Sequence, residues 1–357
     1  MGAELEESTL SAALSRAMAA GAEVRGTTSP NPPVGAVIVS TAGDIVGVGA
    51  TQPVGGAHAE VMALREAGDR ARGATAVVTL EPCAHTGRTG PCAQAFIDAG
   101  VARVYYLHAD PTPQAAGGAR VLAEAGVDVA KLEKPPHADD ALVPWLFAMK
   151  ARRPHVTLKF AQTLDGFTAA ADGSSQWITG EAARDWVHAD RAHRDAIIVG
   201  TGTALADNPS LTARFSDGSL REHQPRRVII GKRDLESAGD AASNLRELGY
   251  EHYDSIEEAL YELYASGARD VLVEGGAGLA SSFLKADLVD AISAYIAPLL
   301  LGEGRGVLAH PMSQTLAGAT RFQRVGMKAL GDDVLIEYVR ETRGLADNEK
   351  GWMCLLG

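Results

Sequence analysis

The chain has little of what secreted, membrane-spanning and nucleic-acid-binding proteins require. Only three of its 357 residues are cysteine, an odd number and too few for a secreted disulfide scaffold. No run approaches the ~18 consecutive apolar residues of a membrane-spanning helix. Acidic residues outnumber basic ones by 45 to 33, which argues against a surface that holds the nucleic-acid backbone. The acidic start MGAELEESTL lacks the apolar stretch of a signal peptide, so we expect a cytoplasmic protein.

What the chain does have is the composition of an ordinary globular protein, with 46% hydrophobic and 22% charged residues. At about 100–200 residues per domain, its length predicts two domains. Strand-like and helix-like segments alternate on both sides of a charged, Pro-rich stretch, KLEKPPHADD. This alternation favours α/β folds, the first with a largely parallel sheet. We therefore predict a first domain at residues 1–150, a second at 151–343 and a tail at 344–357.

The individual elements follow from hydrophobic periodicity and turn residues. In the first half, the sequence predicts strands at 34–39, 44–49, 74–80, 101–107 and 127–129, and helices at 10–18, 57–67, 91–99, 117–125 and 141–150. In the second half, it predicts strands at 155–161, 196–200, 227–230, 270–273, 291–296 and 333–338, and helices at 181–191 and 256–266.

Four residues of the first half carry the strongest chemical signal. His58 and Glu60 lie two residues apart at a predicted helix start, and Cys83 and Cys92 follow a predicted strand. One imidazole and two thiolates make three protein ligands and leave a fourth tetrahedral position for water, as in a catalytic zinc site. Zinc lowers the pKa of such a water to roughly 7. We expect each thiolate to follow a strand and open a helix, where the helix dipole favours its charge.

Glu60 has the role that a deaminase needs beside its metal. Attack of water on an amino-bearing ring carbon requires a proton to reach the ring nitrogen and then the leaving ammonia. The pattern H-x-E followed by P-C-x-x-C is typical of zinc-dependent nucleobase deaminases. The chain matches it except that eight residues, not two, separate Cys83 from Cys92. A solvated histidine and two buried apolar cysteines are the alternative, which explains each residue singly but not the four in this order.

With this longer gap, the sequence resembles the bifunctional deaminase–reductase family of riboflavin biosynthesis. The resemblance rests on Asn31-Pro32-Pro33-Val34-Gly35, His58-Ala59-Glu60, Thr79-Leu80-Glu81-Pro82-Cys83, His85, Gly87, Arg88, Thr89, Pro91-Cys92 and Asp110-Pro111, and it spans roughly residues 8 to 340. It implies an N-terminal cytidine-deaminase-like three-layer domain and a C-terminal dihydrofolate-reductase-like domain. The first would deaminate 2,5-diamino-6-(5-phosphoribosylamino)pyrimidin-4-one.

The resemblance also implies substrate contacts in the first domain. Asn31 would read the pyrimidine edge with its amide, although its residue type alone fits a turn-former equally well. His85 and Arg88 lie between the ligand cysteines and hence near the mouth of the site, where Arg88 could hold the 5-phosphate. The family often has a histidine where this chain has Thr51, which leaves any phosphate or ribose contact there in doubt.

The second half resembles the same family's reductase domain, which implies NADPH-dependent reduction of the ribosyl group to ribityl. The matching segments are VTLKFAQTLDGFTAA, SSQWITG and VGTGTALADNPSLTAR. A cofactor is required because no side chain supplies a hydride. Two turns suit phosphate groups, Gly200–Thr203 after a buried strand and Glu274–Gly276 at a helix start. Neither is the G-x-G-x-x-G fingerprint, and a plain tight turn is the alternative.

The residue-level match assigns the sites of this domain. Lys159 and Asp165 are the catalytic candidates, which would steer the proton that accompanies the hydride, with a snorkelling surface lysine as the rival interpretation of Lys159. The cofactor would be lined by Ala161, Trp177, Thr203, Asp207, Gly276, Ala277, Gly278, Leu279, Ala280, Ser281 and Ser282. The substrate would be lined by Ser175, Arg191, Leu211, Arg214 and Glu274. Lys232 and Arg233 are both candidates for the 2′-phosphate of NADPH.

Other functions remain open at this point. One is a single-function deaminase or reductase whose other domain is inactive or repurposed. Another is an RNA- or DNA-editing deaminase, which the acidic charge and the fused reductase disfavour. We expect zinc and NADPH as cofactors and a small-molecule phosphoribosylaminopyrimidine as the substrate. We expect neither nucleic acid nor membrane as a partner, and a homo-oligomer, either a dimer or a tetramer.

Overall fold

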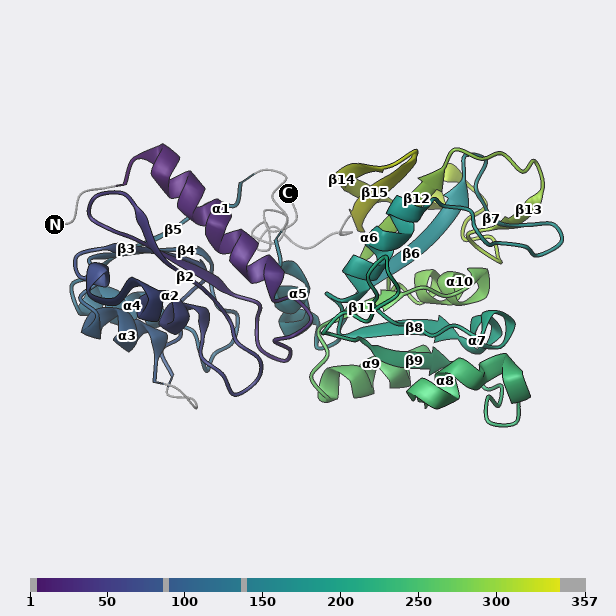
Figure 1. Cartoon of the computed structure of the whole chain (residues 1–357), viewed down its shortest axis with the longest axis horizontal. Helices are drawn as coiled ribbons and strands as arrows, with labels where there is room; N and C mark the ends of the chain where they lie inside the picture. Colours follow the sequence, from purple (N-terminus) through teal and green to yellow (C-terminus); the bar gives the residue numbers. More distant parts are fainter. Residues whose placement is uncertain (1–4, 86–89, 136–139, 341–357) are drawn as a thin grey trace. The chain divides into compact units, whose positions relative to one another are not determined.

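The computed structural model describes residues 5–85, 90–135 and 140–340 of the chain (Figure 1). The chain forms two compact units, Met1–Arg152 and Arg153–Gly357. In the described parts of both units, no helix has the length and apolar character needed to cross a membrane.

The first unit is built on a five-stranded sheet in the order β2-β1-β3-β4-β5. Its strands are β1 (Gly35–Val39), β2 (Ile45–Ala50), β3 (Thr75–Leu80), β4 (Arg103–His108) and β5 (Asp128–Lys131). Strands β3, β4 and β5 are parallel, whereas β1 runs antiparallel to both β2 and β3. Four of the five strands therefore run the same way, as the predicted largely parallel sheet requires, and only β1 runs against them because it forms a hairpin with β2.

Helices cover both faces of this sheet and make three layers (Figure 1). The helices are α1 (Glu7–Glu23), α2 (Ala59–Ala67), α3 (Cys92–Asp98), α4 (Gly118–Glu124) and α5 (Val143–Ala151). Apolar residues of α1 pack on the side chains of one face, among them Val37, Val77 and Leu107. Helices α2, α3 and α4 lie on the other face (Figure 1). This arrangement confirms the predicted three-layer α/β class.

The second unit has an eight-stranded sheet in the order β10-β9-β8-β11-β6-β12-β15-β14. Its strands are β6 (His155–Thr163), β8 (Ala196–Gly200), β9 (Arg226–Ile230), β10 (Glu251–Tyr253), β11 (Asp270–Val273), β12 (Ala291–Ala297), β14 (Phe322–Leu330) and β15 (Asp333–Arg340). All neighbours are parallel except β12–β15 and β15–β14. A separate two-stranded sheet pairs β7 (Phe167–Ala170) with β13 (Gly304–Gly306).

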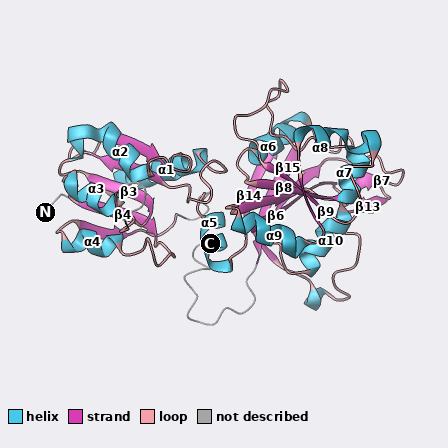
Figure 2. Ribbon diagram, turned by 90° about the horizontal axis from the view of Figure 1, so that it is seen from below, coloured by secondary structure: helices cyan, strands magenta, loops and turns pink. Residues whose placement is uncertain are grey.

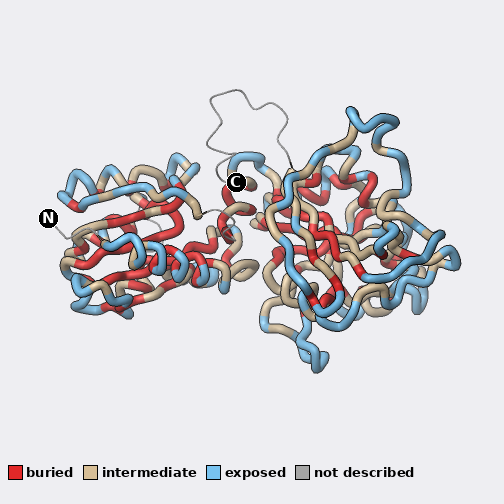
Figure 3. Tube along the Cα trace, turned by 90° about the horizontal axis from the view of Figure 1, so that it is seen from above, coloured by how far each residue is buried: buried red, intermediate tan, exposed pale blue. Residues whose placement is uncertain are grey.

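Helices also cover both faces of the larger sheet (Figure 2). They are α6 (Glu181–Arg191), α7 (Thr201–Asp207), α8 (Ser243–Leu248), α9 (Ile256–Ala265) and α10 (Ala277–Lys285). Helices α9 and α10 pack on one face, with Ile198 and Val273, while α7 and α8 pack on the other, with Ile197 and Val199. Burial is concentrated in the strands between these helices (Figure 3).

Helix α2 lies unusually close to the hairpin, since two strand glycines let its backbone approach. A Cβ added at Gly47 would lie 2.2 Å from the carbonyl oxygen of Ala63, and one at Gly49 would lie 2.1 Å from that of Ala59. Both positions therefore require glycine if α2 is to keep its place. Because α2 begins one residue after His58, this contact also sets where His58 and Glu60 lie.

We predict that Gly49→Ala lowers the free energy of unfolding by about 1–3 kcal/mol, since the added methyl forces α2 away from β2. Calorimetric unfolding of the full chain measures this. The matched control is Gly306→Ala, where the nearest atom to the new Cβ is 3.9 Å away. Equal stability of the two variants would show that the close packing of α2 is not required.

Candidate functional site

The topology of the first sheet brings its predicted site residues to one edge. Because β1 is antiparallel to its neighbours, its start lies beside the ends of β2 and β3. Gly35 pairs with Ala50 at the end of β2, and the Gly35 N–H donates to Thr79 Oγ1 at 3.1 Å. The loops that carry Asn31, His58 and Cys83 all leave the sheet at this edge.

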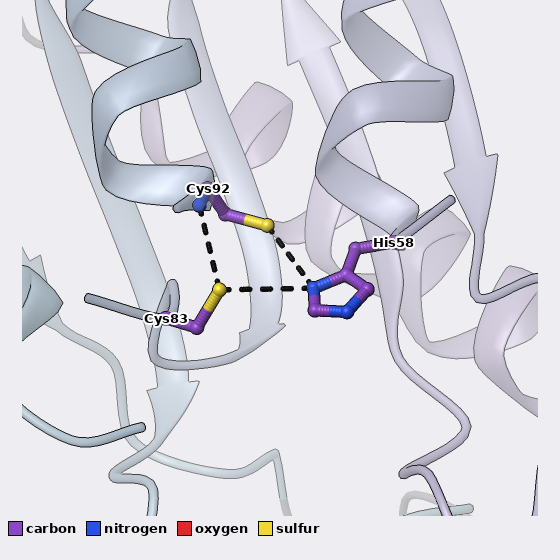
Figure 4. A group of neighbouring side chains, drawn as sticks. All are labelled: His58, Cys83 and Cys92. Atoms are coloured by element: carbon purple, nitrogen blue, oxygen red, sulfur yellow. Dashed lines mark hydrogen bonds between the residues drawn. The ribbon is translucent and has the colours of Figure 1, made fainter. Parts of the chain in front are cut away.

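The three predicted zinc ligands converge there (Figure 4). The Nδ1 atom of His58 lies 3.7 Å from Cys83 Sγ and 3.3 Å from Cys92 Sγ, and the three ligand atoms all lie within 4.8 Å of one another. A tetrahedral zinc with ordinary bond lengths holds a nitrogen and a sulfur ligand about 3.6 Å apart. The donor set and its spacing therefore fit zinc.

The two thiols are held in unequal environments. Cys92 is the first residue of α3, and its N–H donates to Cys83 Sγ at 3.4 Å. Hydrogen bonds from the Cys92 side chain, from His58 and from this amide outweigh burial and lower the pKa of Cys83 to about 4. The neighbouring Cys83 and burial raise the pKa of Cys92. A cation between the sulfurs removes this conflict, because it lets both carry negative charge.

Only one of the two cysteines opens a helix, contrary to the prediction for both. Cys83 lies in the loop after β3, and it contacts the start of α3 only through the Cys92 amide.

Glu60 lies in the first turn of α2 and is buried. Burial, and then the charge of Cys83, raise the pKa of its carboxyl to about 7. A carboxyl with this pKa accepts and gives up a proton equally readily near neutral pH. The Glu60 carboxyl also has a hydrogen bond with the Cys92 thiol. Glu60 therefore lies beside the three predicted zinc ligands.

Glu81 has a role that the sequence analysis missed. Its buried carboxylate accepts hydrogen bonds from the Asp110 N–H at 3.3 Å and from the Gly117 and Ala119 N–H groups at 3.1 Å each. These bonds fasten the segment before Cys83 to the end of β4 and the start of α4. A Cβ at Gly118 would lie 1.7 Å from the Pro82 carbonyl oxygen, so the two segments also touch directly.

The remaining predicted residues of this domain lie in three environments. Asn31 is in the turn before β1, where its N–H donates to the Thr28 carbonyl at 2.9 Å. His85 is exposed, two residues after Cys83, and Arg88 lies outside the described residues. Thr51 is buried, and its hydroxyl accepts from the Val34 N–H at 3.1 Å. Thr51 thus links the residue that follows β2 to the residue that precedes β1.

In the second unit, Glu274 follows β11 and pairs with Arg191 of α6. The Arg191 Nε and Nη2 atoms lie 2.7 and 2.8 Å from the two carboxylate oxygens, and Lys159 Nζ on β6 lies 3.8 Å from Oε2. Burial opposes ionisation of Glu274, but the charges of Arg191 and Lys159 outweigh it and lower its pKa to about 2. Burial, and the charge of Arg191, lower the pKa of Lys159.

Asp165 is exposed and lies outside this buried cluster. Its carboxylate accepts from Thr163 Oγ1 at 2.5 Å, from the Leu301 N–H at 3.0 Å and from the Gly302 N–H at 2.6 Å. These contacts fasten the loop after β12 to the turn after β6. They explain the lowered pKa of Asp165, and they give it an organising role in the loop.

Several predicted cofactor-lining residues gather where β8 and β11 end side by side. Gly276 caps α10, and its N–H donates to Thr203 Oγ1 in α7 at 3.0 Å. The rest of the predicted stretch, Ala277 to Ser282, lies in α10. Trp177 is 67% exposed, with the Arg184 guanidinium 4.8 Å from its ring centre. Ala161 lies on β6, the strand that pairs with β11.

The other predicted contacts of this domain lie on or near the loops. Asp207 ends α7 and is exposed, as are Ser175 and Arg214. Leu211 is buried, with a positive φ of 48°. Arg191 is largely engaged, because Nη1 also donates to the Thr212 carbonyl at 3.0 Å.

Comparison with known proteins places both halves. Residues 7–108 match the cytidine and deoxycytidylate deaminase zinc-binding region, and residues 154–336 match the RibD C-terminal domain. The riboflavin biosynthesis protein RibD of Corynebacterium ammoniagenes is 70% identical over 308 residues, which are 86% of this chain and 91% of that protein. RibD of Mycobacterium tuberculosis (strain ATCC 25618 / H37Rv) is 47% identical over 318 residues, 89% of this chain and 93% of that protein.

Solved structures agree with these matches. Acinetobacter baumannii RibD, form 1, superposes with a TM-score of 0.79 at 34% identity, covering 94% of this chain and 100% of that one. The Thermotoga maritima deaminase/reductase superposes with a TM-score of 0.81 at 31% identity, covering 94% of this chain and 99% of that one. The fold and site define a two-domain enzyme in which a zinc-binding deaminase precedes a reductase. The chain belongs to the RibD family, the bifunctional deaminase–reductases of riboflavin biosynthesis.

We predict that Glu81→Gln weakens zinc binding by about 10- to 100-fold, the usual effect of disturbing groups that support metal ligands. The amide nitrogen of glutamine would face backbone N–H donors that now meet a carboxylate. Competition with a chromophoric chelator measures the affinity.

The control is Glu66→Gln, at an exposed carboxylate that accepts one bond, from the Val48 N–H at 2.9 Å. If both variants bind zinc like the wild type, Glu81 does not support the site.

Proposed function

We propose that residues 1–150 hydrolytically deaminate 2,5-diamino-6-(5-phosphoribosylamino)pyrimidin-4-one and that residues 151–343 then reduce the ribosyl group of the product to ribityl with NADPH. The observation that carries the first half is the buried carboxyl of Glu60 beside three convergent ligands, His58, Cys83 and Cys92. The Thermotoga maritima relative, whose name specifies both reactions, supports the choice of substrate.

In the deaminase, His58 Nδ1 and the two thiolates would hold the zinc ion. Zinc bound there supplies the Lewis acidity that makes a water acidic enough to attack at neutral pH. Glu60 takes the proton of the attacking water and gives it to the ring nitrogen. It then carries a second proton to the amino group, which leaves as ammonia while the ring carbon becomes a carbonyl. A pKa of about 7 suits Glu60 to both directions of transfer.

The substrate contacts of the deaminase follow from the loops at the same sheet edge. The Asn31 amide would read the pyrimidine edge, since Asn31 lies in the turn that enters β1 there. His85, exposed beside the ligand loop, and Arg88 would meet the ribose phosphate.

In the reductase, NADPH supplies the hydride that reduces C1′ of the ribosylamine in its open-chain imine form. Lys159 would protonate or stabilise the ribose ring oxygen as the ring opens, because burial favours release of its proton. Glu274 keeps Lys159 and Arg191 in place with a carboxylate that stays ionised. Arg191 and Arg214 would hold the 5-phosphate, and Ser175 and Leu211 the sugar.

The cofactor would lie across α7 and the start of α10. Its lining there would be Thr203, Asp207 and Gly276 to Ser282, and Ala161 and Trp177 would also contact it. As the residue that selects NADPH over NADH we favour Arg233. Its Nη1 atom lies 3.9 Å from the position of a Cβ built at Gly202 in α7. An arginine there can pair with the 2′-phosphate. Asp165 remains a second candidate for steering the proton. We also propose a cytoplasmic homo-oligomer, a dimer or a tetramer.

For the deaminase, Glu60→Gln tests the proton carrier. The variant should bind zinc like the wild type but release ammonia about 10²- to 10⁴-fold more slowly, since glutamine cannot carry the proton. Reduction of substrate that has already been deaminated should not change. Ammonia release at the wild-type rate would remove Glu60 from the mechanism.

For the reductase, Lys159→Met should slow NADPH oxidation with deaminated substrate by about 10²-fold or more, because the proton donor is lost. Ammonia release should be unaffected. Lys328→Met is the control, since Lys328 lies on the edge strand β14 with its ammonium 3.7 Å from the Trp186 ring centre. A Lys159 variant that reduces substrate as fast as this control would show that Lys159 is only structural.

A further inference from the structure

Helix α5 follows the charged, Pro-rich stretch, at the boundary that the sequence predicts between the two domains. It belongs to the first unit, and four of its nine side chains are buried: Pro144, Trp145, Leu146 and Ala148. A connection that served only as a spacer would not need this burial.

The start of α5 is fastened to the end of β4. Asp140 Oδ2 lies 2.7 Å from His108 Nε2, and both side chains are 3% exposed. The other carboxylate oxygen of Asp140 accepts from the Leu142 N–H at 3.1 Å. His108 pairs with Leu80 across β3 and β4, and its carbonyl accepts from the Glu81 N–H at 2.7 Å. The helix is thus anchored at the sheet edge that carries the zinc ligands.

One turn further along, Trp145 contacts the turn that leads into β1. Its ring is buried, and its Nε1–H donates to the Pro30 carbonyl oxygen at 3.0 Å. A buried indole N–H requires an acceptor, so this bond is a fixed feature of the packing. The two residues are 115 positions apart in the chain.

The acceptor is the carbonyl of the peptide that joins Pro30 to Asn31. Since a peptide group is planar, fixing its carbonyl oxygen also fixes the direction of the Asn31 N–H and the start of the Asn31 backbone. On the other side of the turn, the Asn31 N–H donates to the Thr28 carbonyl, and Thr28 Oγ1 donates to the Asn31 carbonyl at 3.0 Å. Asn31 is therefore held from within its own turn and, through Trp145, from α5.

We propose that Trp145 is a positioning residue of the deaminase, which orients the Asn31 amide toward the pyrimidine through its hydrogen bond to Pro30. The proposal rests on the proposed role of Asn31 in substrate binding. It makes the connecting helix a working part of the deaminase site rather than a link to the reductase. It also accounts for the two contacts at the start of α5, one with the end of β4 and one with the turn before β1.

The test is a double-mutant cycle in the full chain with Trp145→Phe and Asn31→Ala. Phenylalanine keeps an aromatic ring but has no N–H donor. Trp145→Phe alone should raise the KM for deamination by about 5-fold, the effect of one net hydrogen bond. The kcat should stay within about twofold, because the pyrimidine contact is made equally in the bound substrate and the transition state. Zinc content and reduction of deaminated substrate should equal those of the wild type.

The cycle separates positioning from a general loss of structure. If Trp145 acts through Asn31, then adding Trp145→Phe to Asn31→Ala changes KM by less than about twofold. Trp186→Phe, on α6 of the other unit, is the matched control and should leave deamination unchanged. Additive effects of the two substitutions, or an unchanged KM in Trp145→Phe, would overturn the proposal.

Failure of the proposed function is recognisable separately. If Asn31→Ala alone leaves KM unchanged, Asn31 does not bind the pyrimidine, and the role of Trp145 falls with it. If the zinc-loaded wild type releases no ammonia from the diaminopyrimidinone, the substrate assignment itself is wrong.

Discussion

Two buried thiols, a half-buried imidazole and a buried carboxyl lie together at the edge of the first sheet, and a cation bound there would let both sulfurs carry negative charge. Without one, the two sulfurs compete for charge, so that the pKa of Cys92 rises while that of Cys83 falls. Much of the surrounding structure serves this arrangement. Strand glycines bring α2 and its leading histidine close to the hairpin, and Glu81 fastens the loop that carries Cys83. The metal and the fold therefore support each other.

In the second unit, side chains alone stabilise a buried charge. Glu274 is buried, yet its carboxylate stays ionised because Arg191 contacts both oxygens and Lys159 lies nearby. The same arrangement keeps a lysine with a lowered pKa in the middle of β6, beside the end of β11. In both units, burial shifts the pKa of the groups that we propose as proton carriers, Glu60 and Lys159.

The sequence predicted those parts of the fold and site that depend on local pattern. Uninterrupted apolar runs identified central strands such as β3 and β8, and the spacing of His58, Cys83 and Cys92 predicted a group of three side chains that the structure brings together. Strand β14 was missed because it lies at the sheet edge and its residues are mostly half-buried or exposed, which removes the apolar signal. Helix α7 was missed because Gly200 to Thr203 has the composition of a turn.

The roles of Glu81 and Trp145 do not follow from local pattern. Each depends on partners far away in the chain, backbone groups in one case and the Pro30 carbonyl in the other. A single residue type does not reveal such partners, and only the fold brings them together. The direction of β1 beside β3 was missed for the same reason, since strand order and direction arise from long-range packing and not from the strands themselves.

The central claim, two successive reactions on one chain, is tested most directly by following both products with the wild-type protein. The zinc-loaded chain is incubated with the phosphoribosylamino-diaminopyrimidinone, with and without NADPH, and ammonia and NADPH oxidation are measured separately. If one chain carries out both reactions, ammonia appears without NADPH, and NADPH is oxidised only after deamination has begun. NADPH oxidation without ammonia release, or a zinc-loaded chain that releases none, would contradict it.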